Sequence, residues 1–234
     1  MRSKITIFIF GAPGAGKGVT AQTLKEKYMF KHLSMGEYLR QKVFSKDNAI
    51  LKYKNIIEKG QTLIPCDVVN NIYQNFAKSN LENNCIIDGY PRTLKQLIFL
   101  EKYHKKDVDR DLRFLFFEAD EDLLLRRLLS RETCTQCLHD YIFEKIHRKG
   151  HCNLCGGRLY KRETDNTDSI KQRIKMFNIV TKTILPDIEQ RFPVYRIDTN
   201  KNIHSIYKDV LNIVNISHLS ETPSKCIISS KKNS

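Results

Sequence analysis

The sequence predicts an α/β fold in which a parallel five-stranded sheet is wrapped by helices and two small lobes are inserted into the core. The first observation behind this prediction is the alternation of short apolar runs with segments of helical periodicity. Such an alternation favours parallel strands that are joined by helices. The apolar runs typical of strands are residues 5–10, 32–33, 85–88, 112–118 and 194–197.

Between these runs, apolar residues recur at the spacing of a helix. Pro186 interrupts the pattern that follows residue 183. Because proline cannot donate a backbone hydrogen bond inside a helix, we expect a bend or a break there. The predicted helices are residues 16–27, 37–44, 67–78, 94–103, 121–130, 169–183 and 203–214.

Two regions break the alternation, and this is the second observation. Residues 35–65 are helix-rich with no strand signal, and residues 131–165 lose helical periodicity and carry paired cysteines. Both are therefore interpreted as lobes inserted into one core. The polar, Ser- and Lys-rich residues 217–234 are expected to form a disordered tail. The predicted core comprises residues 1–34, 66–130 and 166–216.

Composition sets wide limits on function. The 234 residues include 40 Lys+Arg and 26 Asp+Glu, giving a formal net charge of +14, which fits nucleic acid, a membrane surface or a polyanionic small molecule. No stretch reaches the roughly 18 apolar residues of a membrane span. Seven cysteines, four of them in two Cys-x-x-Cys pairs, favour metal binding in a reducing compartment. With a strand predicted from residue 5, we expect no targeting segment and a cytoplasmic protein, mitochondria being the alternative.

A glycine-rich loop follows the first predicted strand directly. Residues 11–18 read Gly-Ala-Pro-Gly-Ala-Gly-Lys-Gly and lead into a predicted helix. Such a loop lets backbone N–H groups converge on an anion, the helix N-terminus adds a favourable dipole, and Lys17 adds a full charge. The segment is therefore interpreted as a P-loop that binds the phosphates of a nucleotide.

The paired cysteines predict a metal site. Cys134 and Cys137 are followed, after fourteen residues, by Cys152 and Cys155. Two such pairs supply four thiolates for a tetrahedral Zn²⁺ site, and because no coordination position stays open the metal would be structural. The histidines between the pairs (His139, His147 and His151) are interpreted as surface residues.

An acid and several arginines surround these motifs. Asp88 ends the third predicted strand, where a carboxylate beside a P-loop is placed to hold hydrated Mg²⁺. Thr167 is the expected N-cap of the helix that follows the cysteine lobe. Phosphoryl transfer needs positive charge distributed around the transferred group. The arginines that flank the cysteine lobe or follow Asp88 are Arg92, Arg127, Arg131, Arg162 and Arg173.

From about residue 4 to residue 214 the chain resembles the adenylate kinase (nucleoside monophosphate kinase) family. The resemblance rests on residues 11–18, on Leu-Ser-Met-Gly-Glu-Tyr-Leu-Arg at 33–40, on Asp-Gly-Tyr-Pro-Arg-Thr at 88–93 with Gln96, and on the four cysteines. It implies that residues 35–65 form the monophosphate-binding lobe. It also implies that residues 131–165 form a lid that closes over the triphosphate.

The resemblance further implies reversible, Mg²⁺-dependent transfer of the γ-phosphoryl group from ATP to AMP. Asp88 would position the hydrated metal, and Lys17, Arg92, Arg127, Arg131, Arg162 and Arg173 would act on the transferred group. The triphosphate would contact Gly14, Ala15, Gly16, Lys17, Gly18, Val19, Arg127 and Arg131. AMP would contact Met35, Arg40, Leu63, Ile64, Gly89, Arg92, Gln96, Arg162 and Arg173.

Three residues depart from the family pattern. Val19 stands where a threonine is usual, Met35 replaces a small or hydroxylic residue near the monophosphate base, and Glu132 stands where a basic residue is common. None removes a charge assigned to the transition state. The resemblance therefore implies an active enzyme with altered affinities.

Alternatives remain open at this point. Residues 31–34 and 63–65 look similar to the GTP:AMP phosphotransferase branch, so the donor is ATP or GTP. Another class is a zinc-ribbon P-loop protein that binds nucleic acid, with Tyr141, Phe143 and Tyr160 as possible stacking residues. A third is a nucleotide sensor without turnover. We expect a monomeric kinase with neither nucleic-acid nor membrane partners.

Overall fold

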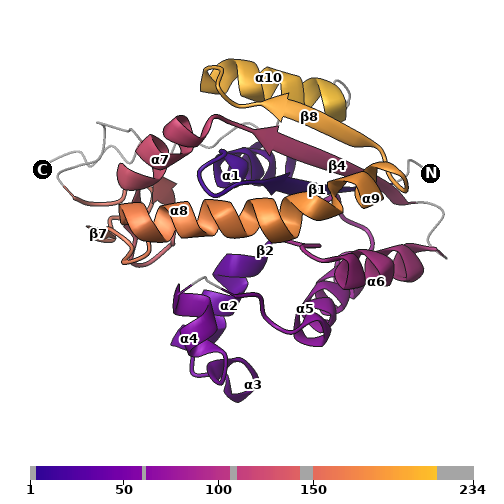
Figure 1. The fold of residues 1–234 in the computed structure, drawn as a ribbon, viewed down its shortest axis with the longest axis horizontal. Coiled ribbons are helices and arrows are strands. Elements are labelled where there is room, and N and C mark those ends of the chain that lie inside the picture. Colours follow the sequence, from indigo (N-terminus) through magenta and orange to yellow (C-terminus); the bar gives the residue numbers. More distant parts are fainter. Residues whose placement is uncertain (1–3, 60–61, 106–109, 143–149, 215–234) are drawn as a thin grey trace, which may run out of the picture.

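The computed structural model describes residues 4–59, 62–105, 110–142 and 150–214 (Figure 1). The predicted tail, 217–234, lies outside the described residues, as do Phe143 and His147 of the cysteine lobe.

The central sheet has five parallel strands in the order β2-β3-β1-β4-β8. Its register places Ile9 of β1 opposite Asp88 of β3 and opposite Leu115 of β4. All five predicted strands are confirmed, and the α/β fold class is correct. The strand bounds are β1 Lys4–Gly11, β2 Lys31–Ser34, β3 Cys85–Asp88, β4 Arg110–Glu118 and β8 Val194–Asp198.

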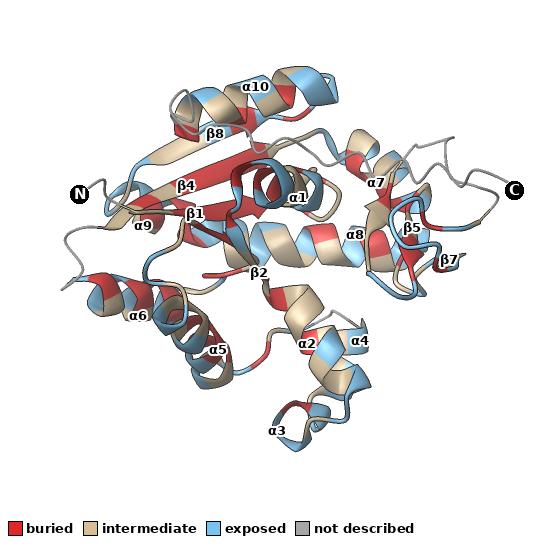
Figure 2. Ribbon diagram, turned by 180° about the vertical axis from the view of Figure 1, so that it is seen from behind, coloured by how far each residue is buried: buried red, intermediate tan, exposed pale blue. Residues whose placement is uncertain are grey.

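Helices cover both faces of this sheet because successive strand residues point to opposite faces. Phe8 and Phe10 of β1 join the apolar cluster beneath α5, α6 and α9, whereas Ile7 and Ile9 join the cluster beneath α1, α7, α8 and α10. Figures 1 and 2 show α1 and α10 on one side of the sheet and α5 and α6 on the other. The bounds are α1 Lys17–Tyr28, α5 Cys66–Lys78, α6 Leu94–His104, α7 Glu121–Leu129, α8 Thr167–Met176, α9 Leu185–Glu189 and α10 Ile203–Val214.

Two insertions interrupt this layered arrangement. Three short helices, α2 (Met35–Phe44), α3 (Asn48–Leu51) and α4 (Lys54–Lys59), lie between β2 and α5 and extend away from the sheet in Figure 1. A small antiparallel sheet of order β6-β5-β7 lies between α7 and α8. Its strands are β5 Glu132–Cys134, β6 Asp140–Tyr141 and β7 Leu159–Tyr160.

The helix predicted over 169–183 differs from the prediction at both ends. Its N-cap is Asn166, whose side-chain oxygen accepts a 2.9 Å hydrogen bond from the Ser169 N–H, so the expectation of a Thr167 cap is wrong by one residue. The α-helix ends at Met176 and continues as a π-helical turn over Phe177–Thr181 and a 3₁₀ turn over Lys182–Ile184. Pro186 falls in the first turn of α9, where its missing N–H needs no partner. Within the described ranges, no helix combines the length and the apolar character that crossing a membrane requires.

Candidate functional site

The glycine-rich loop curls around the N-terminus of α1. Gly11 and Gly14 have φ angles of 146° and 85°, and a Cβ on Gly11 would lie 2.6 Å from the carbonyl oxygen of Phe117. Only glycine fits both the backbone conformation and the space there. Lys17, the first residue of α1, folds back over the loop, and its Nζ donates hydrogen bonds to the carbonyl oxygens of Gly11 (2.8 Å) and Ala12 (2.9 Å).

Electrostatics at the loop favour an incoming anion. Burial lowers the pKa of Lys17 to about 8, and the negative charge of Asp88 opposes this effect only in part. Asp88 ends β3 and lies opposite Ser34 of β2 in the sheet register. A buried ammonium group next to free backbone N–H groups is stabilised when phosphate oxygens replace the lost water.

Arg92 lies close to the backbone at the end of β3. Its Nε donates a 3.0 Å hydrogen bond to the carbonyl oxygen of Gly89. A Cβ on Gly89 would lie 2.9 Å from Nη2 of Arg92, so this glycine makes room for the guanidinium. Burial lowers the pKa of Arg92, with Asp88 opposing. The buried Gln96, on α6, accepts a 2.6 Å hydrogen bond from the backbone N–H of Arg92 and so fixes this turn.

The helical insertion supplies a second arginine, Arg40, whose guanidinium also packs against a glycine. Arg40 on α2 approaches the backbone so closely that a Cβ on Gly36 would lie 3.2 Å from its Nη1. Burial lowers the pKa of Arg40, and the nearby charge of Arg162 lowers it further. The N-cap of α2 is Ser34, whose hydroxyl accepts a hydrogen bond from the Glu37 N–H. Helix α2 therefore starts directly at the end of β2 and holds Arg40 beside the sheet.

A cavity of about 600 Å³ opens between the sheet end, the helical insertion, the small antiparallel sheet and α8. Three residues of the π-helical turn (Phe177, Val180 and Thr181) and the residue before it (Met176) also line the cavity, and no feature of the sequence pointed to them. Predicted site residues that line it are Lys17, Met35, Arg40, Leu63, Ile64, Gly89, Arg92, Gln96, Arg162 and Arg173. The predicted residues outside this lining are Gly14, Ala15, Gly16, Gly18, Val19, Asp88, Arg127 and Arg131.

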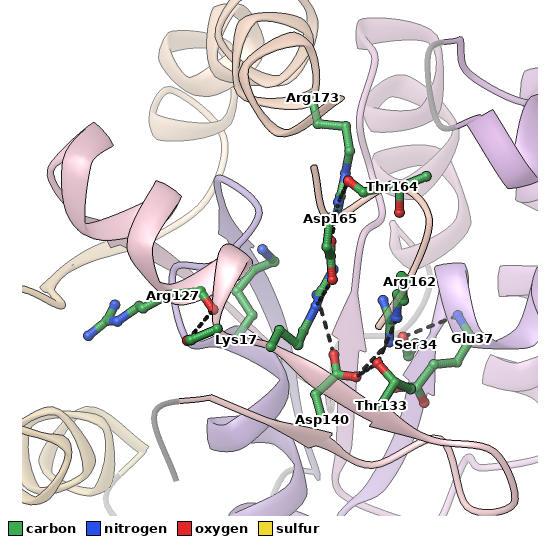
Figure 3. A network of polar contacts seen from close by, with 12 residues as sticks. Lys17, Ser34, Glu37, Arg127, Thr133, Asp140, Arg162, Thr164, Asp165 and Arg173 are labelled. Carbon is green, nitrogen blue, oxygen red and sulfur yellow. Dashed lines mark hydrogen bonds and ion pairs between the residues drawn. The ribbon is translucent and has the colours of Figure 1, made fainter. Parts of the chain in front are cut away.

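Two arginines of the lid side share one buried carboxylate (Figure 3). Asp165, with 1% of its side chain exposed, accepts hydrogen bonds from Arg131 Nε (2.8 Å) and Nη2 (2.5 Å). It also accepts one from Arg173 Nη1 at 3.1 Å. Burial would lower the pKa of Arg131, but the contacts with Asp165 and Asp140 outweigh it and raise this pKa. Burial and the charge of Arg131 lower the pKa of Arg173 to about 10.

A second carboxylate, Asp140 of β6, extends this network to Arg162. It accepts hydrogen bonds from Arg131 Nη1 (3.3 Å), Arg162 Nη2 (2.7 Å) and the Thr133 hydroxyl (2.7 Å). Neither acid was predicted as a site residue. Asp165 is 34 and 8 residues from its partners Arg131 and Arg173, and Asp140 is 9 and 22 residues from Arg131 and Arg162, so neither pairing has a local signal in the sequence.

Arg127 lies apart from the other arginines. Its Nη2 donates a 2.9 Å hydrogen bond to the carbonyl oxygen of Thr199, and its Nη1 lies 3.5 Å from that of Gly14. Burial lowers its pKa. Figure 3 shows this side chain away from the contacts that join Arg173, Asp165, Asp140 and Arg162. The structure thus brings Arg131, Arg162 and Arg173 together and leaves Arg127 behind the P-loop.

The four paired cysteines meet at one point. Their Sγ atoms lie within 4.8 Å of one another, close to the spacing of about 3.8 Å that tetrahedral Zn–S bonds of 2.3 Å impose. A Cβ on Gly157 would lie 2.8 Å from Cys134 Sγ, so the chain leaves room for this sulfur. The donor set therefore fits a structural Zn²⁺.

Backbone N–H groups reach two of the four sulfurs. The N–H groups of Gln136 and Leu154 approach Cys134 Sγ and Cys152 Sγ, each at 3.4 Å. Burial alone would raise the pKa of Cys152, but hydrogen bonds from Tyr141 and from backbone N–H groups lower it to about 6. His139 packs edge-on against the Tyr141 ring and is not among the clustered ligands in the described part of the chain.

Comparison with known proteins identifies the family. The family model described as adenylate kinase matches residues 9–192. The chain belongs to the adenylate kinase family. It is 33% identical over 214 residues to an adenylate kinase of Thermosipho melanesiensis, covering 90% of this chain and 99% of that protein. It is 31% identical over 216 residues to an adenylate kinase of Rickettsia bellii, with coverage of 90% and 99%. The adenylate kinase family is one of phosphotransferases, and the chain is an enzyme of this class.

Proposed function

We propose that the protein catalyses the reversible, Mg²⁺-dependent transfer of the γ-phosphoryl group from ATP to AMP, giving two ADP. One observation carries the proposal: five cations from separate parts of the chain line a single cavity, namely Lys17, Arg40, Arg92, Arg162 and Arg173. Phosphoryl transfer is catalysed by positioning and by distributed positive charge, with little covalent chemistry for the protein to do.

On the donor side, Lys17 holds the β- and γ-phosphates, and the loop amides from Gly14 to Val19 hold the remaining phosphate oxygens. The supporting observations are the φ angles of Gly14 and Gly16, at 85° and 90°, and the position of the loop before α1. Arg127, which lies behind the loop, contacts the triphosphate away from the transferred group. Asp88 holds the hydrated Mg²⁺, and the metal supplies charge neutralisation on the phosphate oxygens.

On the acceptor side, Arg40 and Arg92 bind the phosphate of AMP. Both guanidinium groups have pKa values that burial lowers, so an anionic partner stabilises their charged forms. Gln96 and Gly89 face the base together with an apolar surface that includes Met35, Leu63 and Ile64. The support for this assignment is their shared position in the cavity.

The lid, residues 131–165, closes over the transferred group and excludes water, which would otherwise hydrolyse the triphosphate. Arg131, Arg162 and Arg173 then surround the group in transfer. Four cysteines hold Zn²⁺, which makes the small antiparallel sheet move as one body. The proposal is supported by the convergence of the four Sγ atoms.

A nucleic-acid-binding role for the cysteine lobe loses support in this structure. Tyr141, one of the candidate stacking residues, is 4% exposed and its hydroxyl lies 3.2 Å from Cys152 Sγ. Its ring therefore packs the metal site. Tyr160 remains exposed but lines the proposed nucleotide cavity.

The test is a coupled assay of ADP production with ATP or GTP as donor and AMP, CMP or UMP as acceptor. We expect turnover with ATP and AMP that the Lys17→Met variant lacks. Turnover with GTP but not ATP would assign the alternative GTP:AMP reaction. Nucleotide binding with no turnover for any pair would contradict the proposal and favour a sensor.

We also propose a monomeric enzyme of the cytoplasm. Size-exclusion chromatography with light scattering tests the first statement, and imaging of the tagged full chain tests the second, with mitochondrial signal as the contrary result.

A further inference from the structure

The geometry points to Asp140 as a positioning residue that aims Arg162, and with it Arg131, at the transferred phosphoryl group. The inference rests on the proposed function and concerns a residue that lies outside the cavity lining. Asp140 joins the two ends of the lid, because Arg131 immediately precedes β5 and Arg162 follows β7.

The first support comes from the hydrogen bonds of the Arg162 guanidinium. Nε donates a 2.9 Å hydrogen bond to the Thr133 hydroxyl, and Nη2 donates a 2.7 Å hydrogen bond to Asp140. One edge of the planar group is thereby fixed, while the same side chain lines the cavity. When one edge of a guanidinium is held in this way, its remaining N–H groups keep a fixed orientation and can donate hydrogen bonds to a phosphate.

The second support is the rigidity of the frame. Thr133 of the central strand pairs with Asp140 of β6 on one side and with Tyr160 of β7 on the other. Thr133 is fully buried, and its hydroxyl donates to Asp140 while accepting from Arg162. The sheet register therefore fixes the two groups that hold the Arg162 guanidinium, Thr133 and Asp140.

The third support is charge. Arg131, Arg162 and Arg173 carry three positive charges, and Asp140 and Asp165 compensate two of them. Three close guanidinium groups repel one another when no anion separates them. Asp140 keeps Arg131 and Arg162 together before the nucleotides arrive, so that the arginines need not reorganise during the reaction.

The test compares Asp140→Asn with Asp140→Glu and with the control Asp168→Asn, which removes an exposed acid from the first turn of α8. The amide keeps the shape but replaces one acceptor with a donor that faces an arginine. We expect kcat to fall about 10- to 100-fold in Asp140→Asn, as for other misplaced groups, while KM for ATP and AMP changes less than about threefold. Asp140→Glu should recover part of the loss, and Asp168→Asn should match the parent enzyme.

A double-mutant cycle separates positioning from a merely structural role. If Asp140 acts through Arg162, Asp140→Asn should lower kcat by a clearly smaller factor in the Arg162→Ala background than in the parent enzyme, and the remaining loss should be the part that Arg131 carries. An equal fold-loss in both backgrounds would overturn the inference, as would an unchanged or raised kcat in Asp140→Asn alone. A loss carried entirely by KM would overturn it too. Absence of ADP formation by the parent enzyme would instead contradict the proposed function.

Discussion

The two sides of the cavity hold their positive charges in different ways. On the core side, Lys17 contacts the carbonyl oxygens of Gly11 and Ala12, and Arg92 contacts that of Gly89. On the lid side, the arginines contact the carboxylates Asp140 and Asp165. Neutral hydrogen-bond partners leave the core cations undercompensated, whereas Asp140 and Asp165 compensate two of the three lid-side charges before any nucleotide binds.

This difference suggests that the core-side cations mainly strengthen nucleotide binding, whereas the lid-side cations mainly hold a fixed orientation. A cation whose hydrogen bonds go only to neutral carbonyl groups gains most when an anion arrives. The pKa values of Lys17 and Arg92, which desolvation lowers and the charge of Asp88 restores only in part, reflect that. A compensated cation gains less from the anion but is held in place beforehand. We therefore expect core-side changes to act mainly on the reaction, and changes in the lid acids to act on stability and orientation.

Arg92→Ala should give the largest effect. Removing this guanidinium takes away charge that is proposed to interact most strongly in the transition state, so kcat should fall roughly 10²- to 10³-fold. The exposed Arg196, which pairs with Glu118 and Glu189, offers the matched control, and Arg196→Ala should leave kcat unchanged. Steady-state kinetics measure both, and near-normal turnover of Arg92→Ala would remove Arg92 from the reaction.

Asp165→Asn should mainly lower stability. The amide leaves the buried Arg131 without its bidentate partner, and loss of one member of a buried pair costs about 3–5 kcal/mol of unfolding free energy. Urea unfolding measures this against Asp187→Asn, which breaks a more exposed pair with Arg191 and should change little. Equal losses of unfolding free energy in the two variants would contradict the view that Asp165 stabilises the fold by compensating the charge of Arg131.

Chelation should destabilise the lid with a smaller effect on turnover. Removing zinc from reduced protein should lower the melting temperature by roughly 5 °C, since a structural metal contributes folding free energy. Gly157→Ala, whose Cβ would lie 2.8 Å from Cys134 Sγ, should lose zinc at lower chelator concentration. Gly18→Ala, where a Cβ meets nothing within 4 Å, controls for the added methyl. An unchanged melting temperature after chelation would refute the structural role.

The smallest expected effect is a pH dependence of triphosphate binding. The pKa of Lys17 in the free enzyme is about 8, below its usual value, so Lys17 loses its charge as the pH rises through 8. Bound phosphate favours the protonated form, hence binding weakens above that pH, by about tenfold between pH 8 and 9.5. Calorimetric titration of ATP from pH 7 to 9.5 tests this, and a constant Kd over that range would refute it.

Much of the fold could be predicted because its signals are local. The five strands of the central sheet and the helices α1, α2, α5, α6, α7, α8 and α10 follow from apolar periodicity, which depends on residues a few positions apart, whereas the short helices α3, α4 and α9 were not predicted individually. The extent of α8 was harder, since the π-helical turn at Phe177–Thr181 has the same apolar spacing as an ordinary helix. The capping residue Asn166 was missed because Thr167, another residue type that is favoured at N-caps, stands beside it.

The glycine-rich loop with Lys17, the paired cysteines and the supply of arginines can be read directly from the sequence, because the chemistry of each depends on residue type and close spacing. Which of these charges meet depends on how the chain folds. Asp140 reaches Arg131 and Arg162 through the pairing of three strands, and Arg127 turns behind the loop to Thr199. Contacts between residues so far apart depend on sheet register and packing, and these are properties of the folded chain as a whole.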